Sequence, residues 1–236
     1  GAIDAGITTM IDNSHNSRTA AHSDAAVEAL LDTGIRAIHA SGAPVAGEWD
    51  KAHWPGNWQR LQDKYFTDNP ESLVSLAVMA QLEPGLWAEA RRLGLSIVTE
   101  FFGAEMGSEL ESLHQQGLLG PDNIFNHCTA LPDRGWEILR EAGVRVNVCP
   151  RSDSHYGIES GMFAIEAAQR HGINPGLSVD NETSYSTDMF MEMRVAFYLQ
   201  RVMGMHQQQC CDSEHALKTL PAAQLLKAAT LDGAAC

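Results

Sequence analysis

Lysine is scarce in this chain of 236 residues, and Lys51, Lys64, Lys218 and Lys227 are its four examples. The formal net charge at pH 7 is −14, which argues against nucleic acid or an anionic membrane surface as a partner. None of the lysines ends a predicted strand, so the sequence disfavours a Schiff-base enzyme, which needs a lysine there. A small-molecule substrate is therefore the expected partner, and a homo-oligomer stays open as a second one.

The sequence also lacks paired cysteines and long apolar runs. Its cysteines form no CxxC pair: Cys128, Cys149, Cys210, Cys211 and Cys236. This spacing favours reduced, buried thiols in a cytoplasmic protein over a disulfide framework. We find no signal peptide and no apolar run long enough to span a membrane. Because the chain opens on Gly1 and stops at Cys236 directly after a helical stretch, we interpret it as an internal piece of a longer protein.

No glycine-rich nucleotide motif follows the first predicted strand, which weighs against the nucleotide-binding open sheets. Instead, short apolar strands alternate with helices in about seven βα units. We predict strands over residues 7–12, 35–41, 73–80, 95–102, 124–127, 144–149 and 177–180. Repeated βα units need parallel strands with right-handed crossovers, in an open doubly wound sheet or a closed barrel. We predict an α/β fold of the (β/α)8 TIM type, incomplete, forming one partial barrel domain over residues 1–236.

The helices are predicted from apolar spacing and from glycines that follow the last turn. They cover residues 24–33, 58–65, 108–116, 133–142, 162–171, 188–203 and 221–229, and a further helix begins at Pro84. Within residues 188–203, the side chains expected on the apolar side are Met189, Met193, Ala196, Phe197 and Val202. The missing eighth βα unit is expected before Gly1.

Polar residues stand at nearly every predicted strand end, where the active site of such a barrel lies. His127 ends the strand at 124–127, and Asp180 ends the strand at 177–180. A histidine and an aspartate in these places are typical of a metal-assisted hydrolase. Each also has a simpler interpretation, as a hydrogen-bonded core histidine or as a helix-capping aspartate.

Several other loop residues are candidates for contact with a substrate. His15 and His155 follow predicted strands, and we treat them, like His22, as loop residues. Trp49, Trp54 and Trp58 lie in a long loop and either cover the barrel mouth or pack that loop. We take His15, His155 and Trp54 as the predicted substrate-binding residues.

An ordered set of segments resembles the amidohydrolase superfamily, in its cytosine-deaminase-like and chlorohydrolase-type branch. The likeness covers nearly the whole chain and is carried by residues 6–12 (GITTMID), 22–26 (HSDAA), 117–128 (GLLGPDNIFNHC), 148–152 (VCPRS), 176–180 (GLSVD) with 188–190 (DMF), and 228–234 (AATLDGA). The resemblance implies a metal-dependent hydrolase of C–N bonds. It places two histidine metal ligands before Gly1 and a small flanking β-domain beyond the barrel.

The resemblance also implies roles for single residues. Asp180 is implied as metal ligand and as proton acceptor from the hydrolytic water, and His127 as the group that polarises water or substrate beside the metal, which is zinc or iron. The fifth family strand corresponds to residues 97–103, where the expected histidine ligand is replaced by Phe101. Either Glu100 or Glu105 then supplies an oxygen ligand, as zinc tolerates, or the metal has fewer protein ligands, or the site holds none. We take Asp180, His127 and Glu100 as the predicted metal-site residues.

Two function classes remain after these considerations. The first is an amidohydrolase-type, deaminase-like enzyme that hydrolyses C–N or related bonds of a small cyclic or heteroaromatic substrate through an activated water. The alternative is a non-catalytic or metal-free relative that has lost the fifth-strand ligand. A phosphate-binding isomerase is disfavoured, because residues 181–185 (NETSY) do not form the glycine-rich loop that it needs.

Overall fold

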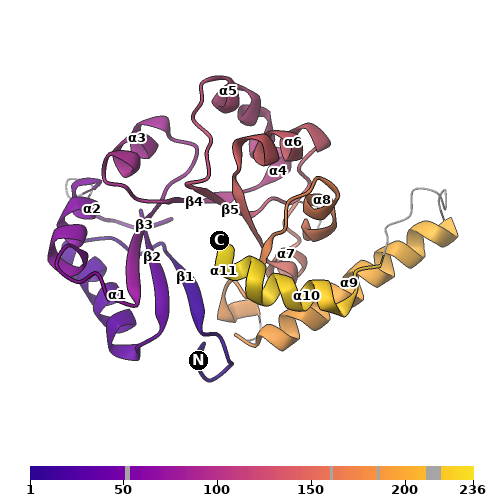
Figure 1. The fold of residues 1–236 in the computed structure, drawn as a ribbon, viewed down its shortest axis with the longest axis horizontal. Helices are drawn as coiled ribbons and strands as arrows, with labels where there is room; N and C mark the ends of the chain where they lie inside the picture. Colours follow the sequence, from indigo (N-terminus) through magenta and orange to yellow (C-terminus); the bar gives the residue numbers. More distant parts are fainter. Residues whose placement is uncertain (51–53, 160–161, 185–186, 211–218) are drawn as a thin grey trace. The chain divides into compact units, whose positions relative to one another are not determined.

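The structure is a computed structural model that describes residues 1–50, 54–159, 162–184, 187–210 and 219–236. Lys51, Cys211 and Lys218 lie outside the described residues. Seven strands follow one another in a single sheet in the order β1-β2-β3-β4-β5-β6-β7 (Figure 1). The predicted number and order of strands is thereby confirmed. The chain divides into two compact units, residues 7–100 with 122–124, and residues 1–6 and 101–121 with 125–236.

The first unit contains the strands near the amino end and the helices between them. Its strands are β1 (Thr9–Ser14), β2 (Arg36–Gly42), β3 (Val74–Met79) and β4 (Ile97–Phe101, whose last residue belongs to the second unit), and its helices are α1 (Ala20–Thr33), α2 (Gly56–Leu61), the π-helix η2 (Gln62–Phe66) and α3 (Pro84–Arg92). The pairs β1–β2, β2–β3 and β3–β4 are parallel. Lys64 lies in η2, away from any strand end.

Alternation along the strands of the first unit separates an apolar face from a mixed one. The apolar cluster consists of Ala40, Ala77, Met79, Val98 and Ile124. His39, the neighbour of Ala40 on β2, is fully buried, and its Nδ1 lies 2.8 Å from Oδ2 of Asp12 on the paired strand. The interior of this unit therefore includes polar pairs beside its apolar cluster.

The second unit contains the remaining strands and most of the helices. Its strands are β5 (Asn123–His127, whose first two residues belong to the first unit), β6 (Arg145–Val148) and β7 (Gly176–Leu177). Its helices are α4 (Gly103–Met106), η3 (Gly107–Glu109), α5 (Leu110–Gln115), α6 (Asp133–Ala142), α7 (Pro150–Tyr156), α8 (Ile165–Arg170), η4 (Glu182–Ser184), α9 (Met189–Cys210), α10 (Ala222–Lys227), η6 (Ala228–Asp232) and α11 (Gly233–Ala235). The pair β6–β7 is parallel.

Helix α7 is the main element that the sequence analysis did not predict. Pro150 occupies its first turn, where proline has no backbone N–H to leave unbonded and its fixed φ suits a helix. His155 therefore lies on a helix rather than in a loop, and His22 likewise lies on α1, whose cap is Thr19. Both loop assignments were wrong. For His155, a helix begins directly after the strand; for His22, the helix begins four residues earlier than predicted.

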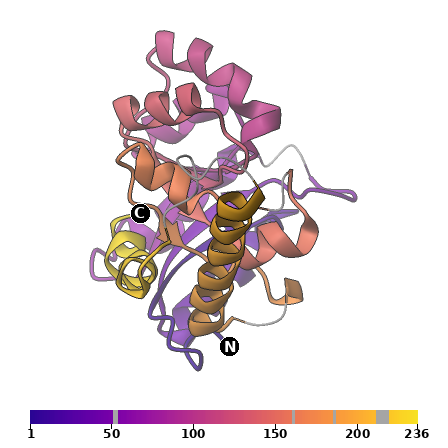
Figure 2. The same ribbon diagram turned by 90° about the vertical axis from the view of Figure 1, so that its right-hand side faces the viewer.

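Helix α9 is longer than predicted, and its buried side shares Ala196 alone with the predicted apolar side. Figure 2 shows it as one uninterrupted rod. Its buried positions are Glu192, Ala196, Gln200 and Gly204, whereas Val202, expected on the apolar side, is 65% exposed. The inward side was missed because two of its four residues are polar. Within the described residues, no helix combines the length and the apolar character needed to cross a membrane.

Gly103 gives a test of how closely the loops of the second unit pack. A Cβ at this position would lie 2.4 Å from the carbonyl oxygen of Thr129 and 2.6 Å from Cα of Leu131, both backbone atoms. We expect Gly103→Ala to lower the free energy of unfolding by about 3 kcal/mol, since the backbone must shift to admit the methyl group. Urea unfolding measures this loss. The matched control is Gly85→Ala in α3, where no atom lies within 4 Å of the added Cβ; it should be neutral or gain about 0.4–1 kcal/mol, and equal losses in both variants would contradict the prediction.

Candidate functional site

His127 stands at the end of β5 in a conformation that is rare for a side chain of its size. Its φ is 67°, in the left-handed region, and only 4% of the residue is exposed. Its Nδ1 lies 2.7 Å from Oδ1 of Asp153, which is fully buried in the first turn of α7. With the carboxylate as acceptor, Nδ1 carries the proton and the ring orientation is fixed. Non-glycine residues in this region cluster at functional sites.

Burial dominates the electrostatics around this pair. It raises the pKa of the Asp153 carboxyl, while the hydrogen bond from His127 lowers it in part and the charge of Asp180 raises it further. Burial also raises the pKa of the Cys149 thiol to about 12 and that of Cys128 as well. Both cysteines are free and buried, as predicted. A thiol that stays protonated at neutral pH is a poor nucleophile, so neither cysteine suits covalent catalysis.

Asp180 follows β7 and has the same unusual backbone conformation, with φ 57°. It is exposed, unlike Asp153. Its Oδ2 accepts hydrogen bonds from Oγ of Ser152 and, at 2.9 Å, from Nδ2 of Asn181. Ser152 and Asp153 are neighbours in the first turn of α7. Ser152 binds Asp180 and Asp153 binds His127. The structure therefore brings the two main candidates to one place.

A buried ion pair anchors the same turn of α7. Nε of Arg151 lies 3.2 Å from Oε2 of Glu192 on α9, and the backbone N–H of Arg151 donates to Oε1 of Glu192 at 2.7 Å. The guanidinium also donates to the carbonyl of Val179, the residue before Asp180, at 3.0 Å. Arg151 thus joins α7, α9 and the segment that carries Asp180. Burial raises the pKa of Glu192 to about 7 against the opposing effect of Arg151.

The end of β4 places its two phenylalanines in different surroundings. Phe101 is fully buried and its ring stacks on Phe125, with centroids 4.7 Å apart. The ring that lies against His127 is that of Phe102, at 5.5 Å between centroids. The aromatic residue beside His127 is therefore Phe102 rather than Phe101, because alternation turns Phe101 into the packed layer. Alternation also places the half-buried side chain of Glu100 on the opposite face of β4 from that of Phe101.

The other acidic candidate at this strand end, Glu105, makes a structural contact through its backbone. Glu105 is exposed, and its backbone N–H donates to Oε1 of Glu159 at 2.9 Å. Oε2 of Glu159 accepts from Oγ1 of Thr129 at 2.7 Å. Glu159 itself has φ 51°, so this carboxylate fastens the loop after β5 to α4.

The part of the chain that the structure describes contains no group of three or more His, Cys, Asp and Glu side chains arranged to hold a metal ion. Asp180 and His127 offer two donors, and Glu100 is not joined to them in such a group. The described donors alone therefore do not complete a metal site, so we derive no step through a metal.

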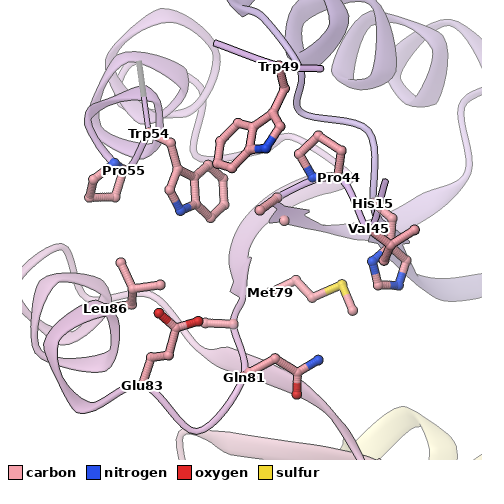
Figure 3. Close-up of a pocket in the computed structure, with 13 residues that line it drawn as sticks. His15, Pro44, Val45, Trp49, Trp54, Pro55, Met79, Gln81, Glu83 and Leu86 are labelled. Carbon is pink, nitrogen blue, oxygen red and sulfur yellow. The ribbon is translucent and has the colours of Figure 1, made fainter. Parts of the chain in front are cut away.

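A pocket of about 480 Å³ lies in the first unit, a volume within the range of small-molecule sites. Two predicted substrate-binding residues, His15 and Trp54, line it, together with the tryptophan of the same loop, Trp49. Figure 3 shows Trp49 and Trp54 on one side, and Met79, Gln81 and Glu83 on the other. The third predicted residue, His155, does not line this pocket; it is exposed on α7 and its ring meets Tyr156 edge to face.

Sequence reasoning missed the partners of its own candidates. Arg151 and Ser152 fell within the segment 148–152 that carries the family resemblance but received no role, Asp153 follows that segment, and Glu192 lay in a helix predicted to have an apolar side. One signal was available: Pro150 directly after a strand marks a helix start, and an aspartate three residues later would then point back to the strand end.

Glu192 gives a pH-dependent stability prediction. Its folded pKa of about 7 exceeds the ordinary value of 4.5, so the folded state binds the proton more tightly and its contribution to stability falls as pH rises between these values. We expect Glu192→Gln to match the wild type near pH 4.5. Above pH 7 the variant should be more stable than the wild type, by about 1.4 kcal/mol for each unit by which the folded pKa exceeds the ordinary value. Urea midpoints measured at several pH values test this; a constant difference between the two proteins would contradict it.

Comparison with known proteins supports this interpretation of the fold. Over 126 residues, 53% of this chain, it is 32% identical to a 5'-deoxyadenosine deaminase of Methanothermobacter thermautotrophicus, and 27% identical over 142 residues to the guanine deaminase of Escherichia coli. The matched parts cover 27% and 32% of those relatives. The matched parts of the chain thus cover about a third or less of the length of these two curated relatives.

Solved structures match nearly the whole chain. A zinc-containing adenosine deaminase from Xanthomonas campestris superposes with a TM-score of 0.75 at 23% identity, over 99% of this chain and 54% of that one. An atrazine chlorohydrolase from Arthrobacter aurescens, complexed with zinc, superposes with a TM-score of 0.78 at 21% identity, over 98% of this chain and 56% of that one. These matches confirm the predicted incomplete TIM-type fold. The sequence profile of the amidohydrolase family matches residues 90–236, and the chain belongs to this family.

Proposed function

We propose that this chain is part of a hydrolase that acts on carbon–nitrogen bonds other than peptide bonds, in a small cyclic or heteroaromatic substrate. The reaction would be deaminase-like, with an activated water as nucleophile. The observation that carries this proposal is the convergence of His127 and Asp180 on the first turn of α7. Relatives that are deaminases of nucleosides and of guanine support the bond type.

The contacts of each residue suggest its role. Asp180 is exposed, so its carboxylate can reach a water molecule, and Ser152 and Asn181 hold it in place. We assign it the proton from that water, which it returns to the leaving amine. His127, oriented by Asp153, would polarise the water or stabilise the charge that develops on the attacked group.

A divalent metal, zinc or iron, is part of this proposal, with Asp180, His127 and Glu100 as its predicted neighbours. When bound, such an ion would lower the pKa of its water towards neutrality. The described donors leave this set incomplete, so at least one ligand must come from elsewhere in the protein. Two of the structures that share the fold contain zinc, which supports looking for that metal first.

We propose His15 and Trp54 as substrate-binding residues, because both line the pocket of the first unit. His155 is kept as a third on the basis of its exposed ring in α7. The buried, free thiols of Cys128 and Cys149 suit a reducing compartment, so we place the protein in the cytoplasm. The net charge of −14 supports a small-molecule substrate over nucleic acid or a membrane surface.

Replacement of Asp180 tests the proposed reaction. In the full-length protein, we expect Asp180→Asn to lower kcat for ammonia release from aminated heterocycles by about 100-fold or more, because the amide cannot take up a proton. The exposed Asp68, in the first unit, provides the control substitution Asp68→Asn, which should leave the rate unchanged. Unchanged turnover in Asp180→Asn would remove this mechanism.

Asp153 gives a second test, because it orients His127 without reaching the substrate itself. Asp153→Asn removes the carboxylate but keeps the side-chain shape, so His127 loses its fixed tautomer. We expect kcat to fall by about 100-fold and the pH profile of kcat to shift, while the urea midpoint stays within a small change of wild type. If stability and activity fell together with an unchanged pH profile, Asp153 would be a packing residue only.

The alternative is a metal-free or non-catalytic relative, which the phenyl ring of Phe102 beside His127 favours. A full-length protein without stoichiometric metal and without turnover on any aminated heterocycle would establish it. Bound metal together with ammonia release would exclude it.

A further inference from the structure

The pocket of the first unit has two aromatic walls that stand at right angles. Trp49 and Trp54 are 6.3 Å apart between ring centroids with planes at 81°, and Trp54 meets Trp58 at 4.6 Å and 79°. Trp58 is fully buried, so its edge-to-face contact ties the indole of Trp54 to the core of this unit. The two walls therefore form a corner rather than a slot, and they offer ring faces in two directions.

The opposite wall carries a carboxylate on a well-ordered turn. The carbonyl of Gln81 accepts hydrogen bonds from the backbone N–H of Glu83 at 2.7 Å and from Nε1 of the buried Trp87 at 2.8 Å. Glu83 then begins α3, and its side chain makes no capping bond there. In Figure 3 the Glu83 carboxylate lies across the pocket from the indole of Trp54.

The floor of the pocket is packed tightly enough to have a defined shape. A Cβ on Gly42 would lie 2.9 Å from Cβ of Met79 and 3.0 Å from the carbonyl oxygen of Ser14. Only glycine lets β2 approach the Met79 side chain in this way. The thioether of Met79 is polarisable and suits contact with an aromatic ring.

These features together suit a cation. Indole faces attract positive charge, more strongly than other aromatic rings do, and a carboxylate supplies the opposite charge. Among the described residues that line the pocket, Glu83 is the only acidic or basic side chain apart from the imidazole of His15. The net charge of −14 favours the approach of cations over anions.

We propose that this pocket selects a planar heteroaromatic ring that carries a positive charge, with the ring against Trp49 and Trp54 and its charged edge towards Glu83. This deepens the proposed function and rests on it where turnover is concerned. A positively charged amino-heterocycle reacts with water to give a neutral oxo-heterocycle and ammonium, so the charge leaves with the ammonium. A pocket of this kind therefore holds the substrate more tightly than the product, which favours product release.

Two isomers that differ in charge test the proposal. At pH 7.5, 1-methyladenosine is a cation and N6-methyladenosine is neutral, although their composition is the same. We expect the full-length protein to bind 1-methyladenosine about tenfold more tightly, a ratio in the range of a cation–π contact with a counter-charge. Titration followed by tryptophan fluorescence and by calorimetry at low salt measures both constants, and chromatography after each titration confirms that the ligand is intact.

Variants identify the residues that cause the preference for the charged isomer. Glu83→Gln should bring the two dissociation constants within about twofold of each other, and Trp54→Leu should weaken both ligands because a ring wall is lost. The matched control is Glu71→Gln, since Glu71 is exposed and precedes β3 whereas Glu83 follows it; it should keep the tenfold ratio. Thermal unfolding of each variant verifies its fold.

The outcomes separate this proposal from the proposed reaction. Equal binding of the isomers, tighter binding of the neutral one, binding of neither, or an unchanged ratio in Glu83→Gln would overturn the cation pocket. Asp180→Asn should leave the ratio unchanged, since Asp180 does not line the pocket. If the isomers behave as expected but no heterocycle is deaminated, the proposed reaction fails and the pocket stands as a binding site.

Discussion

The first turn of α7 is the constraint on which the second unit depends. Its three consecutive residues Arg151, Ser152 and Asp153 contact Glu192, Asp180 and His127 respectively. Successive residues of a helix are rotated by about 100° around its axis, so the side chains of one turn can contact three neighbouring elements. The positions of the imidazole and of the exposed carboxylate are therefore set by the start of a single short helix, which Pro150 begins.

This arrangement lowers the stability of the folded state. Asp153 and Glu192 are both fully buried, and burial raises the pKa of each, which means that their charged forms are disfavoured there. A buried ion pair such as Arg151–Glu192 contributes less to stability than a hydrophobic replacement often does. The left-handed backbone at His127 and Asp180 adds to this cost. Apolar packing elsewhere must offset this loss of stability. The same contacts fix the geometry of the two strand ends.

The fold was largely predictable, and the site was predictable only in part, for the same physical reason. Strand and helix periods are local, so seven strands and most helices could be assigned from spacing alone. His127 and Asp180 could be named because His127 ends β5 and Asp180 follows β7 by three residues. Their partners could not, because Asp153 and Glu192 act through contacts 26 and 41 residues away in sequence. That Phe102 rather than Phe101 lies beside His127 could not be predicted, because strand alternation becomes ambiguous where the strand stops.

The two sets of candidate residues differ in how they are held, and this difference fits their proposed tasks. His127 and Asp153 are almost fully buried, which keeps the orientation and the hydrogen bonding of the proposed polarising imidazole fixed. Gln81 and Glu83 are exposed on a turn, while the tryptophans opposite them are half-buried. Exposed groups on a fixed backbone can exchange one ligand for another without disturbing the core. In the proposed function, the chemistry would thus rest on a carboxylate and an imidazole held by buried polar contacts, whereas ligand selection would rest on an aromatic corner and an exposed charge that can be varied at little cost to stability.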